Sequence, residues 1–229
     1  MLYTRIYKTD TPGERECYNK FMGKRNLVIA ILSGITLIFV GLVLAKNITQ
    51  KPERITISLP YRPENPVKSI LPMGETIEHD ARTGGHPGID FQWSNSVPLI
   101  AVADGEITYA GNPKHKENEY AVNLRVGQYD VYYTELAKIE QGIEKGVKVK
   151  KGDVIAYPGH FFEEHFQTHW EFKFANKLMS GRLCPLTYFD ENSLQRIIKE
   201  WDNGKHASTQ KIGKEFPYIC SGSYKDKNE

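Results

Sequence analysis

One stretch of strict alternation between polar and apolar side chains decides the fold: Gln167-Thr168-His169-Trp170-Glu171-Phe172-Lys173-Phe174. Successive side chains of a β-strand point to opposite faces of its sheet. The pattern therefore predicts a strand with Thr168 and the aromatic residues in a core and the polar residues on the other face. His169 lies among these polar neighbours, and on this stretch alone it fits a functional or a structural histidine equally well.

Similar short runs of β-branched and aromatic residues precede this strand and are separated by Gly, Pro, Asn and Asp. We expect turns at Asp104-Gly105 and Gly127-Gln128. Helical spacing is absent from this part of the chain, so the sequence predicts a mainly β fold, an antiparallel sheet or sandwich. The expected strands lie near Gly88–Gln92, Leu99–Val102, Glu106–Ala110, Ala121–Val126, Val131–Leu136, Asp153–Tyr157 and Thr168–Phe174.

An amphipathic helix is predicted after the strands. Leu194, Ile197, Ile198 and Trp201 recur at the spacing of one helical face. Asp190, Asn192 or Ser193 can cap the start of this helix, and Gly204 is expected to end it. Its apolar stripe should pack on the sheet.

Length and composition restrict the class of protein. The 229 residues suit one domain with appendages or two very small domains, and an apolar content of 40% is ordinary for a globular chain. The net charge is +2, with 30 basic and 28 acidic residues and no long basic run, so we expect no nucleic-acid partner.

An uncharged apolar run from Leu27 to Ala45 predicts a transmembrane helix over 26–45. Gly23-Lys24-Arg25 precede the run, and this basic flank favours a cytoplasmic N-terminus, with the C-terminal part periplasmic or extracellular. The chain would then be a single-pass protein of the inner or cytoplasmic membrane. Val43 and Ala45 could mark a signal-peptidase site, but the run is longer than a signal peptide's, which favours an uncleaved anchor.

The cysteines fit this topology. Cys17 lies on the expected cytoplasmic side, whereas Cys184 and Cys220 lie in the exported part, where a disulfide can persist. Two unpaired thiols are the alternative. An apolar patch over 216–220 is expected to tie the C-terminal tail back to the domain.

A second motif reads Gly84-Gly85-His86-Pro87-Gly88-Ile89-Asp90. Pro87 and Gly88 argue against a helix, so His86 and Asp90 are expected in a turn that leads into a strand. Imidazole and carboxylate groups are both suitable zinc ligands.

Together, the two motifs resemble those of the lysostaphin-type, or LytM-like, zinc peptidases, which cut peptide cross-bridges of bacterial peptidoglycan. His86, Gly88 and Asp90 match the H-x-G-x-D signature of that family, and His169 matches the second histidine of its H-x-H-F-E signature. Two elements between the motifs and one closing element also follow the family in order, and the resemblance covers about Gly74 to Phe189. These elements are Val97–Ile107, Lys145–Ile155 and Cys184–Phe189.

The resemblance implies one zinc ion bound by His86, Asp90 and His169. Together with the apolar run and the proline-rich segment that follows it, the resemblance divides the chain into five parts. These are a cytoplasmic N-terminal tail (1–25), the transmembrane helix (26–45), a linker (46–73), a LytM-like domain (74–190) and a C-terminal helix and tail (191–229).

Two departures from the family pattern lie beside the expected metal. The family has further histidines where this chain has Gln167 and Glu135. Glu135 is a chemically reasonable general base, as glutamate is in H-E-x-x-H peptidases. Gln167 cannot shuttle protons, but its amide can hydrogen-bond the substrate or an oxyanion.

Four further residues are candidates for accessory roles. His160 and His165 lie just before the ligand strand, and either can replace a lost histidine. Arg82 can bind a substrate carboxylate. Alternation places Tyr133 on the same face as Glu135. Solvent-exposed loop residues are the alternative for His160, His165 and Arg82.

These features predict a membrane-anchored, extracytoplasmic zinc metalloendopeptidase acting on peptidoglycan peptides. A zinc-holding module without catalysis, which binds peptidoglycan or regulates another hydrolase, is the second hypothesis. An anchored binding protein with a purely structural metal is the third.

Overall fold

The computed structural model describes residues 32, 35–36, 54–74, 85–113, 119–161, 165–175, 181–203 and 219–221. The chain divides into two units, Met1–Pro52 and Glu53–Glu229. In the first unit Leu32, Ile35 and Thr36 are helical, and the rest of the predicted transmembrane segment lies outside the described residues. Within the described residues, no helix is both long and apolar enough to cross a membrane.

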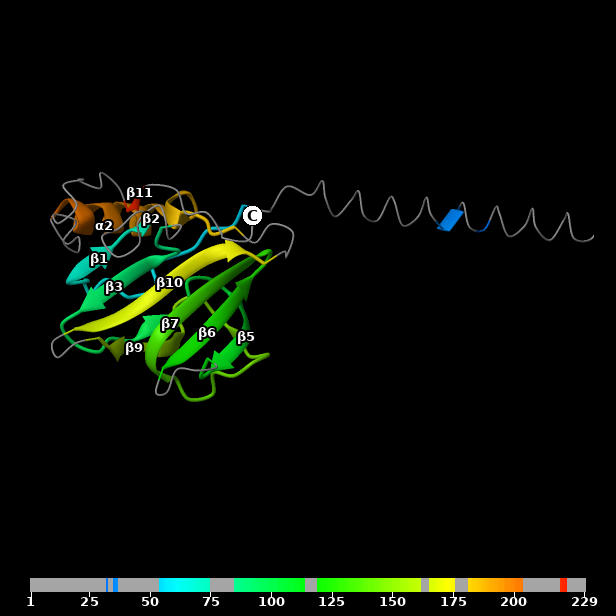
Figure 1. The fold of residues 1–229 in the computed structure, drawn as a ribbon, viewed down its shortest axis with the longest axis horizontal. Helices are drawn as coiled ribbons and strands as arrows, with labels where there is room; N and C mark the ends of the chain where they lie inside the picture. The colour runs from blue at the N-terminus through cyan, green and yellow to red at the C-terminus, as the bar shows by residue number, and fades with distance from the viewer. Residues whose placement is uncertain are drawn as a thin grey trace, which may run out of the picture. The chain divides into compact units, whose positions relative to one another are not determined.

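The second unit is built on a nine-stranded sheet in which every paired strand is antiparallel to its neighbours. Figure 1 shows this sheet extending from β1 (Ser69–Leu71) to β5 (Gly105–Gly111). Near its β1 edge it groups three further elements, β2 (Met73–Gly74), β11 (Cys220–Ser221) and α2 (Glu191–Asp202). The strands are β1 (Ser69–Leu71), β3 (Ile89–Trp93), β4 (Leu99–Ile100), β5 (Gly105–Gly111), β6 (Tyr120–Val126), β7 (Tyr129–Ile139), β8 (Lys148–Val149), β9 (Val154–His160) and β10 (Phe166–Phe174). The predicted mainly antiparallel fold is confirmed.

The alternation of β10 is as predicted. Thr168, Trp170 and Phe172 are buried in the core, and their polar neighbours lie on the opposite face. β10 pairs with β3 on one side and with β7 and β9 on the other. This strand carries His169 and therefore lies between β3, which contains Asp90, and β7, which contains Glu135.

The predicted helix is α2 (Glu191–Asp202), preceded by the short 3-10 helix η2 (Pro185–Thr187). Asp190 caps α2 by accepting a hydrogen bond from the backbone N–H of Ser193 at 2.8 Å. Ile197 and Trp201 are buried, as the stripe predicts, whereas Ile198 is exposed. The helix ends at Asp202, two residues before the predicted Gly204.

The linker predicted over 46–73 is corrected by the structure. Ile57, Leu59 and Tyr61 are buried in the domain core, and Ile70 lies in β1. The segment's prolines interrupt regular pairing, but isolated backbone hydrogen bonds still hold it, such as Ser58 N–H to the Val102 carbonyl at 2.8 Å. The domain therefore includes this segment and begins before residue 74.

Two very short strands form a separate parallel pair that the sequence pattern did not predict. They are β2 (Met73–Gly74) and β11 (Cys220–Ser221). The neighbouring Ile219 is buried, so this part of the predicted tail patch packs on the domain.

Candidate metal centre

The pairing of β3 with β10 creates the site. Asp90 on β3 lies directly opposite His169 on β10, and His86 reaches the same point from the turn before β3. Gly88 makes this approach feasible, because a Cβ atom there would lie 2.4 Å from the Trp170 carbonyl oxygen. Gly88 therefore has a steric role: it lets the turn pack against β10.

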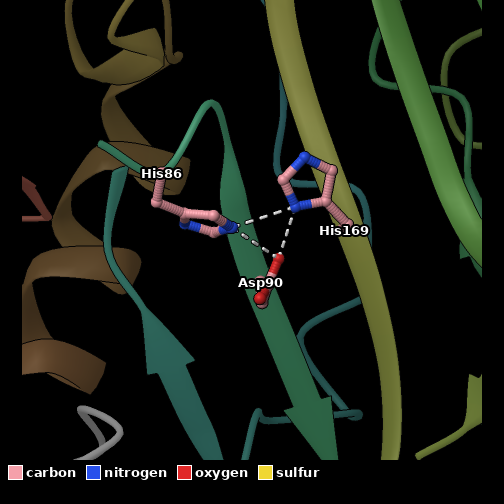
Figure 2. Close-up of side chains that lie close together, drawn as sticks. All are labelled: His86, Asp90 and His169. Carbon is pink, nitrogen blue, oxygen red and sulfur yellow. Dashed lines mark hydrogen bonds and ion pairs between the residues drawn. The ribbon is translucent and has the colours of Figure 1, made fainter. Parts of the chain in front are cut away.

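Three side-chain atoms converge in the structure, as Figure 2 shows. The Asp90 Oδ1 atom lies 2.6 Å from His169 Nδ1 and 3.2 Å from His86 Nε2. The two histidine nitrogens lie 3.1 Å apart. His86 and Asp90 are buried and His169 is partly buried.

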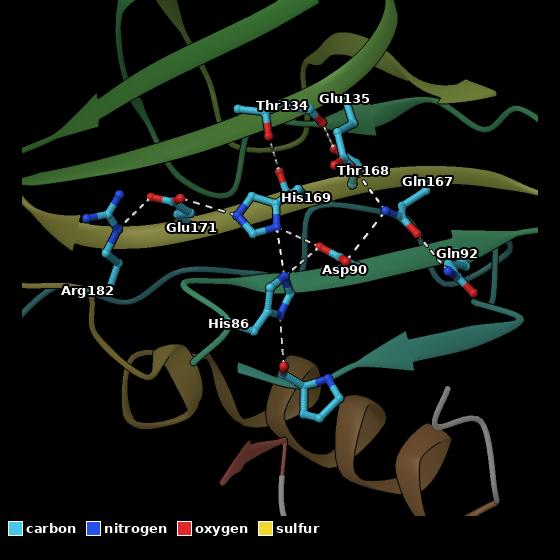
Figure 3. A network of polar contacts seen from close by, with 11 residues as sticks. His86, Asp90, Gln92, Thr134, Glu135, Gln167, Thr168, His169, Glu171 and Arg182 are labelled. Atoms are coloured by element: carbon cyan, nitrogen blue, oxygen red, sulfur yellow. Dashed lines mark hydrogen bonds and ion pairs between the residues drawn. The ribbon is translucent and has the colours of Figure 1, made fainter. Parts of the chain in front are cut away.

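Each histidine is oriented through its other ring nitrogen, as Figure 3 shows. His86 Nδ1 lies 2.8 Å from the Pro72 carbonyl oxygen and can only donate to it. His169 Nε2 lies 3.2 Å from Glu171 Oε1, and Arg182 donates to the other oxygen of Glu171 at 3.0 Å. These partners leave His86 Nε2 and His169 Nδ1 as the two nitrogens directed into the site.

The charges in the site are strongly coupled. Burial opposes ionisation of Asp90, but hydrogen bonds from His169 and His86 outweigh it and lower the pKa of Asp90 to about 2. Burial likewise disfavours the His169 cation, but hydrogen bonds to Asp90 and Glu171 raise the pKa of His169 to about 10. The carboxylates therefore favour a positive charge at this point of the fold.

The donor set fits a zinc ion. Two imidazole nitrogens and a carboxylate oxygen are zinc ligands, and three protein ligands are typical of zinc sites that keep an open position. Three ligand atoms at about 2 Å from a tetrahedral zinc lie about 3.3 Å from one another. The observed separations of 2.6, 3.2 and 3.1 Å need only a small opening to reach this value.

Glu135 and Gln167 lie beside these ligands and contact each other. Gln167 Nε2 donates to Glu135 Oε2 at 2.7 Å and lies 3.5 Å from Asp90 Oδ2. Its carbonyl oxygen accepts from Gln92 Nε2 at 2.6 Å, which fixes the direction of the amide. Gln92 was missed from the sequence, although alternation along β3 places it on the same face as Asp90.

The backbone of Glu135 explains how its side chain reaches the site. Its φ of 58° lies in the left-handed region, which non-glycine residues rarely adopt. Opposite this point, Tyr120 and Val122 of β6 pair with Leu136 and Tyr133, so β7 contains one extra residue there. This β-bulge redirects the side chains that follow it.

The bulge corrects the prediction for Tyr133. Its ring is buried in the core, and its hydroxyl donates to the Ile100 carbonyl oxygen at 3.0 Å. Strict alternation would have placed Tyr133 and Glu135 on one face, but the extra residue places Glu135 on the face of Gln167 and leaves Tyr133 on the other.

The remaining accessory candidates stay predictions. The His160 ring packs edge-on against Phe166 beside the strand that carries Gln167, and His165 Nδ1 lies 3.1 Å from Lys68 Nζ. Arg82 lies outside the described residues.

Cys184 and Cys220 are bonded to each other, with Cα atoms 5.8 Å apart.

Comparison with known proteins agrees with the fold and the motifs. Residues 84–180 match the model of peptidase family M23. This match agrees with the LytM-like resemblance drawn from the two motifs, which is confirmed.

Curated relatives include the murein hydrolase activator NlpD of Salmonella dublin and of Salmonella typhimurium. Each is 28% identical over 120 residues, which cover 52% of this chain and 30% of the relative. The chain thus spans less than a third of the length of these curated relatives.

Solved structures similar to the chain include lysostaphin of Staphylococcus simulans, at 21% identity over 68% of this chain and 59% of that chain, with a TM-score of 0.46. A zinc-containing peptidase of Vibrio cholerae is 24% identical over 52% of this chain and 37% of that chain, with a TM-score of 0.41. Csd3 of Helicobacter pylori is 19% identical over 69% of this chain and 42% of that chain, with a TM-score of 0.46.

Proposed function

We propose that this chain is a membrane-anchored zinc metalloendopeptidase that hydrolyses peptide bonds of peptidoglycan outside the cytoplasm. The observation that carries the proposal is the convergence of His86 Nε2, Asp90 Oδ1 and His169 Nδ1. The second ring nitrogen of each histidine contacts a partner outside this group, which orients the ring. The match of residues 84–180 to the model of peptidase family M23 supports the reaction class. The relation to peptidoglycan rests on the family resemblance and on the similarity to NlpD.

His86, Asp90 and His169 would hold the metal. A zinc ion bound there would polarise the scissile carbonyl group and lower the pKa of a water molecule. The chain's own residues supply the proton handling beside it. Glu135 acts as general base in this proposal. Its carboxylate lies beside the candidate metal ligands, because the Gln167 amide that donates to Glu135 also contacts Asp90.

Gln167 has a positioning role in this proposal. Its amide NH₂ group faces Glu135 and Asp90 because Gln92 occupies its carbonyl oxygen. The hydrogen bond to Glu135 favours the ionised carboxylate, whereas burial and, next, the charge of Asp90 raise the pKa of Glu135. The amide therefore helps to keep the base ionised.

The direct test is digestion of purified muropeptides by the detergent-solubilised full chain. We expect new amino groups in proportion to enzyme concentration, and none from the His169→Ala variant at equal concentration. Equal digestion by both proteins would contradict the proposal.

A second function, zinc-dependent regulation of another cell-wall hydrolase, is favoured by two observations. The curated relatives are named as murein hydrolase activators, and here both expected proton-handling histidines are replaced. In the digestion test, this function predicts no new amino groups from the chain alone and an increase in the rate of a partner hydrolase when the chain is added.

Anchoring through residues 26–45, with the N-terminus in the cytoplasm, is the proposed location of the protein. The uncharged run Leu27 to Ala45 and the basic Gly23-Lys24-Arg25 flank support it. Protease added to spheroplasts should degrade the C-terminal domain. Protection of this domain in intact spheroplasts, with degradation only after lysis, would contradict the orientation.

A further inference from the structure

The disulfide joins two short segments that each support a different histidine of the candidate metal centre. The first segment is 182–184, which ends at Cys184. The second is 219–221, which contains Cys220 and β11. Neither cysteine belongs to the ligand set, so the role of the bond depends on what these segments hold.

The first segment supports His169. The Leu183 N–H donates to the Phe172 carbonyl oxygen at 2.8 Å, and Arg182 bridges to Lys173, so the segment follows the end of β10. Arg182 Nε donates to Glu171 Oε2 at 3.0 Å, and Glu171 Oε1 lies 3.2 Å from His169 Nε2. Cys184 is thus two residues from the side chain that fixes the partner of His169.

The second segment supports His86. β11 pairs with β2, with Cys220 opposite Met73, and the Met73 N–H donates to the Ile219 carbonyl oxygen at 2.9 Å. The next residue of β2, Gly74, bridges to the His86 backbone and donates to its carbonyl oxygen at 2.9 Å.

The residue before β2 completes this support. The Pro72 carbonyl oxygen lies 2.8 Å from His86 Nδ1 and so fixes the tautomer of the ring. β2 has only two residues, and β11 is its strand partner in the sheet pairing. Displacement of β11 would therefore loosen the strand that holds both the backbone and the ring of His86.

We propose that Cys184 and Cys220 are positioning residues: their disulfide ties together the supports of His86 and His169 and holds the two imidazoles at the separation that a metal ion requires. This rests on the metal-binding part of the proposed function and goes beyond it. A bond that acted only on global stability would have no specific effect on metal affinity in the folded protein.

The experiment compares zinc affinity in the folded full-length chain and in a Cys184→Ser/Cys220→Ser variant, by competition with a chromophoric chelator. Cobalt(II), whose absorption spectrum reports coordination, is the second probe. Loss of a residue that orients a metal ligand typically lowers metal affinity about 10–100-fold. We therefore expect a loss of about 10–100-fold and an altered cobalt spectrum.

Ile107→Ala is the matched control for lost stability. Ile107 is buried on β5, and removing its methyl groups lowers stability through a core cavity rather than through the supports of the histidines. All measurements are made well below each variant's unfolding midpoint. The control should keep the zinc affinity of the unmodified chain, even where its Tm falls as far as that of the double variant.

A second measurement serves if the double variant does not fold. The native, zinc-loaded chain is reduced with a trialkylphosphine, and zinc release is followed together with thiol formation. Release in step with reduction supports the proposal. Unchanged affinity after bond removal, full zinc retention after complete reduction, or an equal loss in Ile107→Ala overturns it. A native chain that binds no zinc would instead contradict the proposed function itself.

Discussion

Gln167 donates a hydrogen bond to Glu135, from Nε2 to Oε2 at 2.7 Å. These residues occupy the two positions at which the resembled family has histidines that do not bind the metal. The replacements are therefore complementary, because a donor on β10 faces an acceptor on β7. This pair keeps an ionisable group beside the three converging side chains. For this reason we favour a catalytic site over a zinc-holding module without catalysis.

Replacement of Glu135 by Gln tests whether Glu135 is the general base. The variant retains the size of the side chain but cannot accept a proton, so hydrolysis should fall about 10²–10⁴-fold. Zinc content should not change, because Glu135 is not one of the three converging residues. Glu144→Gln, at an exposed position, is the control. Full activity of the Glu135 variant would remove Glu135 from the mechanism.

Replacement of Gln167 by Leu should shift the pH dependence of hydrolysis. The Gln167 hydrogen bond lowers the pKa of Glu135, so its loss raises that pKa further above the ordinary value. A general base must be ionised to work. The acid limb of the pH–rate profile should therefore move to higher pH, with activity lost first on the acid side. A shift to lower pH, or an unmoved limb with active protein, contradicts the assignment.

Loss of the Glu171 carboxylate should weaken zinc binding without removing a ligand. Glu171 fixes His169 through Nε2, and such outer partners are typically worth about 10–100-fold in metal affinity. Glu171→Ala should therefore bind zinc with a dissociation constant higher by about this factor. Isothermal titration with zinc, against Glu144→Gln as control, measures the difference. Equal affinities would show that His169 needs no such partner.

Gly159 should be intolerant of a side chain. A Cβ atom there would lie 2.5 Å from the Glu135 carbonyl oxygen, and backbone atoms cannot yield as a flexible side chain can. Gly159→Ala should cost about 1–3 kcal/mol of unfolding free energy and disturb the bulge at Glu135. Gly111→Ala is the control, since its nearest contact would be an ordinary 3.5 Å. Denaturant unfolding measures both, and equal stabilities would contradict the steric argument.

The main strands and the helix could be predicted because each has a period that the sequence displays. β10 alternates over its whole length, and α2 repeats its apolar stripe. β1, β2, β8 and β11 have only two or three residues, which is too few for a period. The buried segment around Ile57 resembles a linker in sequence, because prolines and charges surround its three alternating apolar residues.

The convergence of His86, Asp90 and His169 could be predicted because their residue types are chemically distinctive and their spacing matches a known family. Their supports are less visible. The partner of His86 is the main-chain carbonyl of Pro72, which any residue could supply. The left-handed backbone of Glu135 has no sequence signal either, because tertiary packing imposes it on a non-glycine residue. That bulge is the reason why alternation misplaced Tyr133.

The most direct test of the account measures zinc content and muropeptide digestion on one preparation of the full chain. We predict one zinc per chain, new amino groups from the muropeptides, and loss of both when a chelator removes the metal. One zinc per chain with no new amino groups would contradict the proposed hydrolysis and leave the regulatory function. A chain that neither contains nor takes up zinc would contradict the metal centre itself.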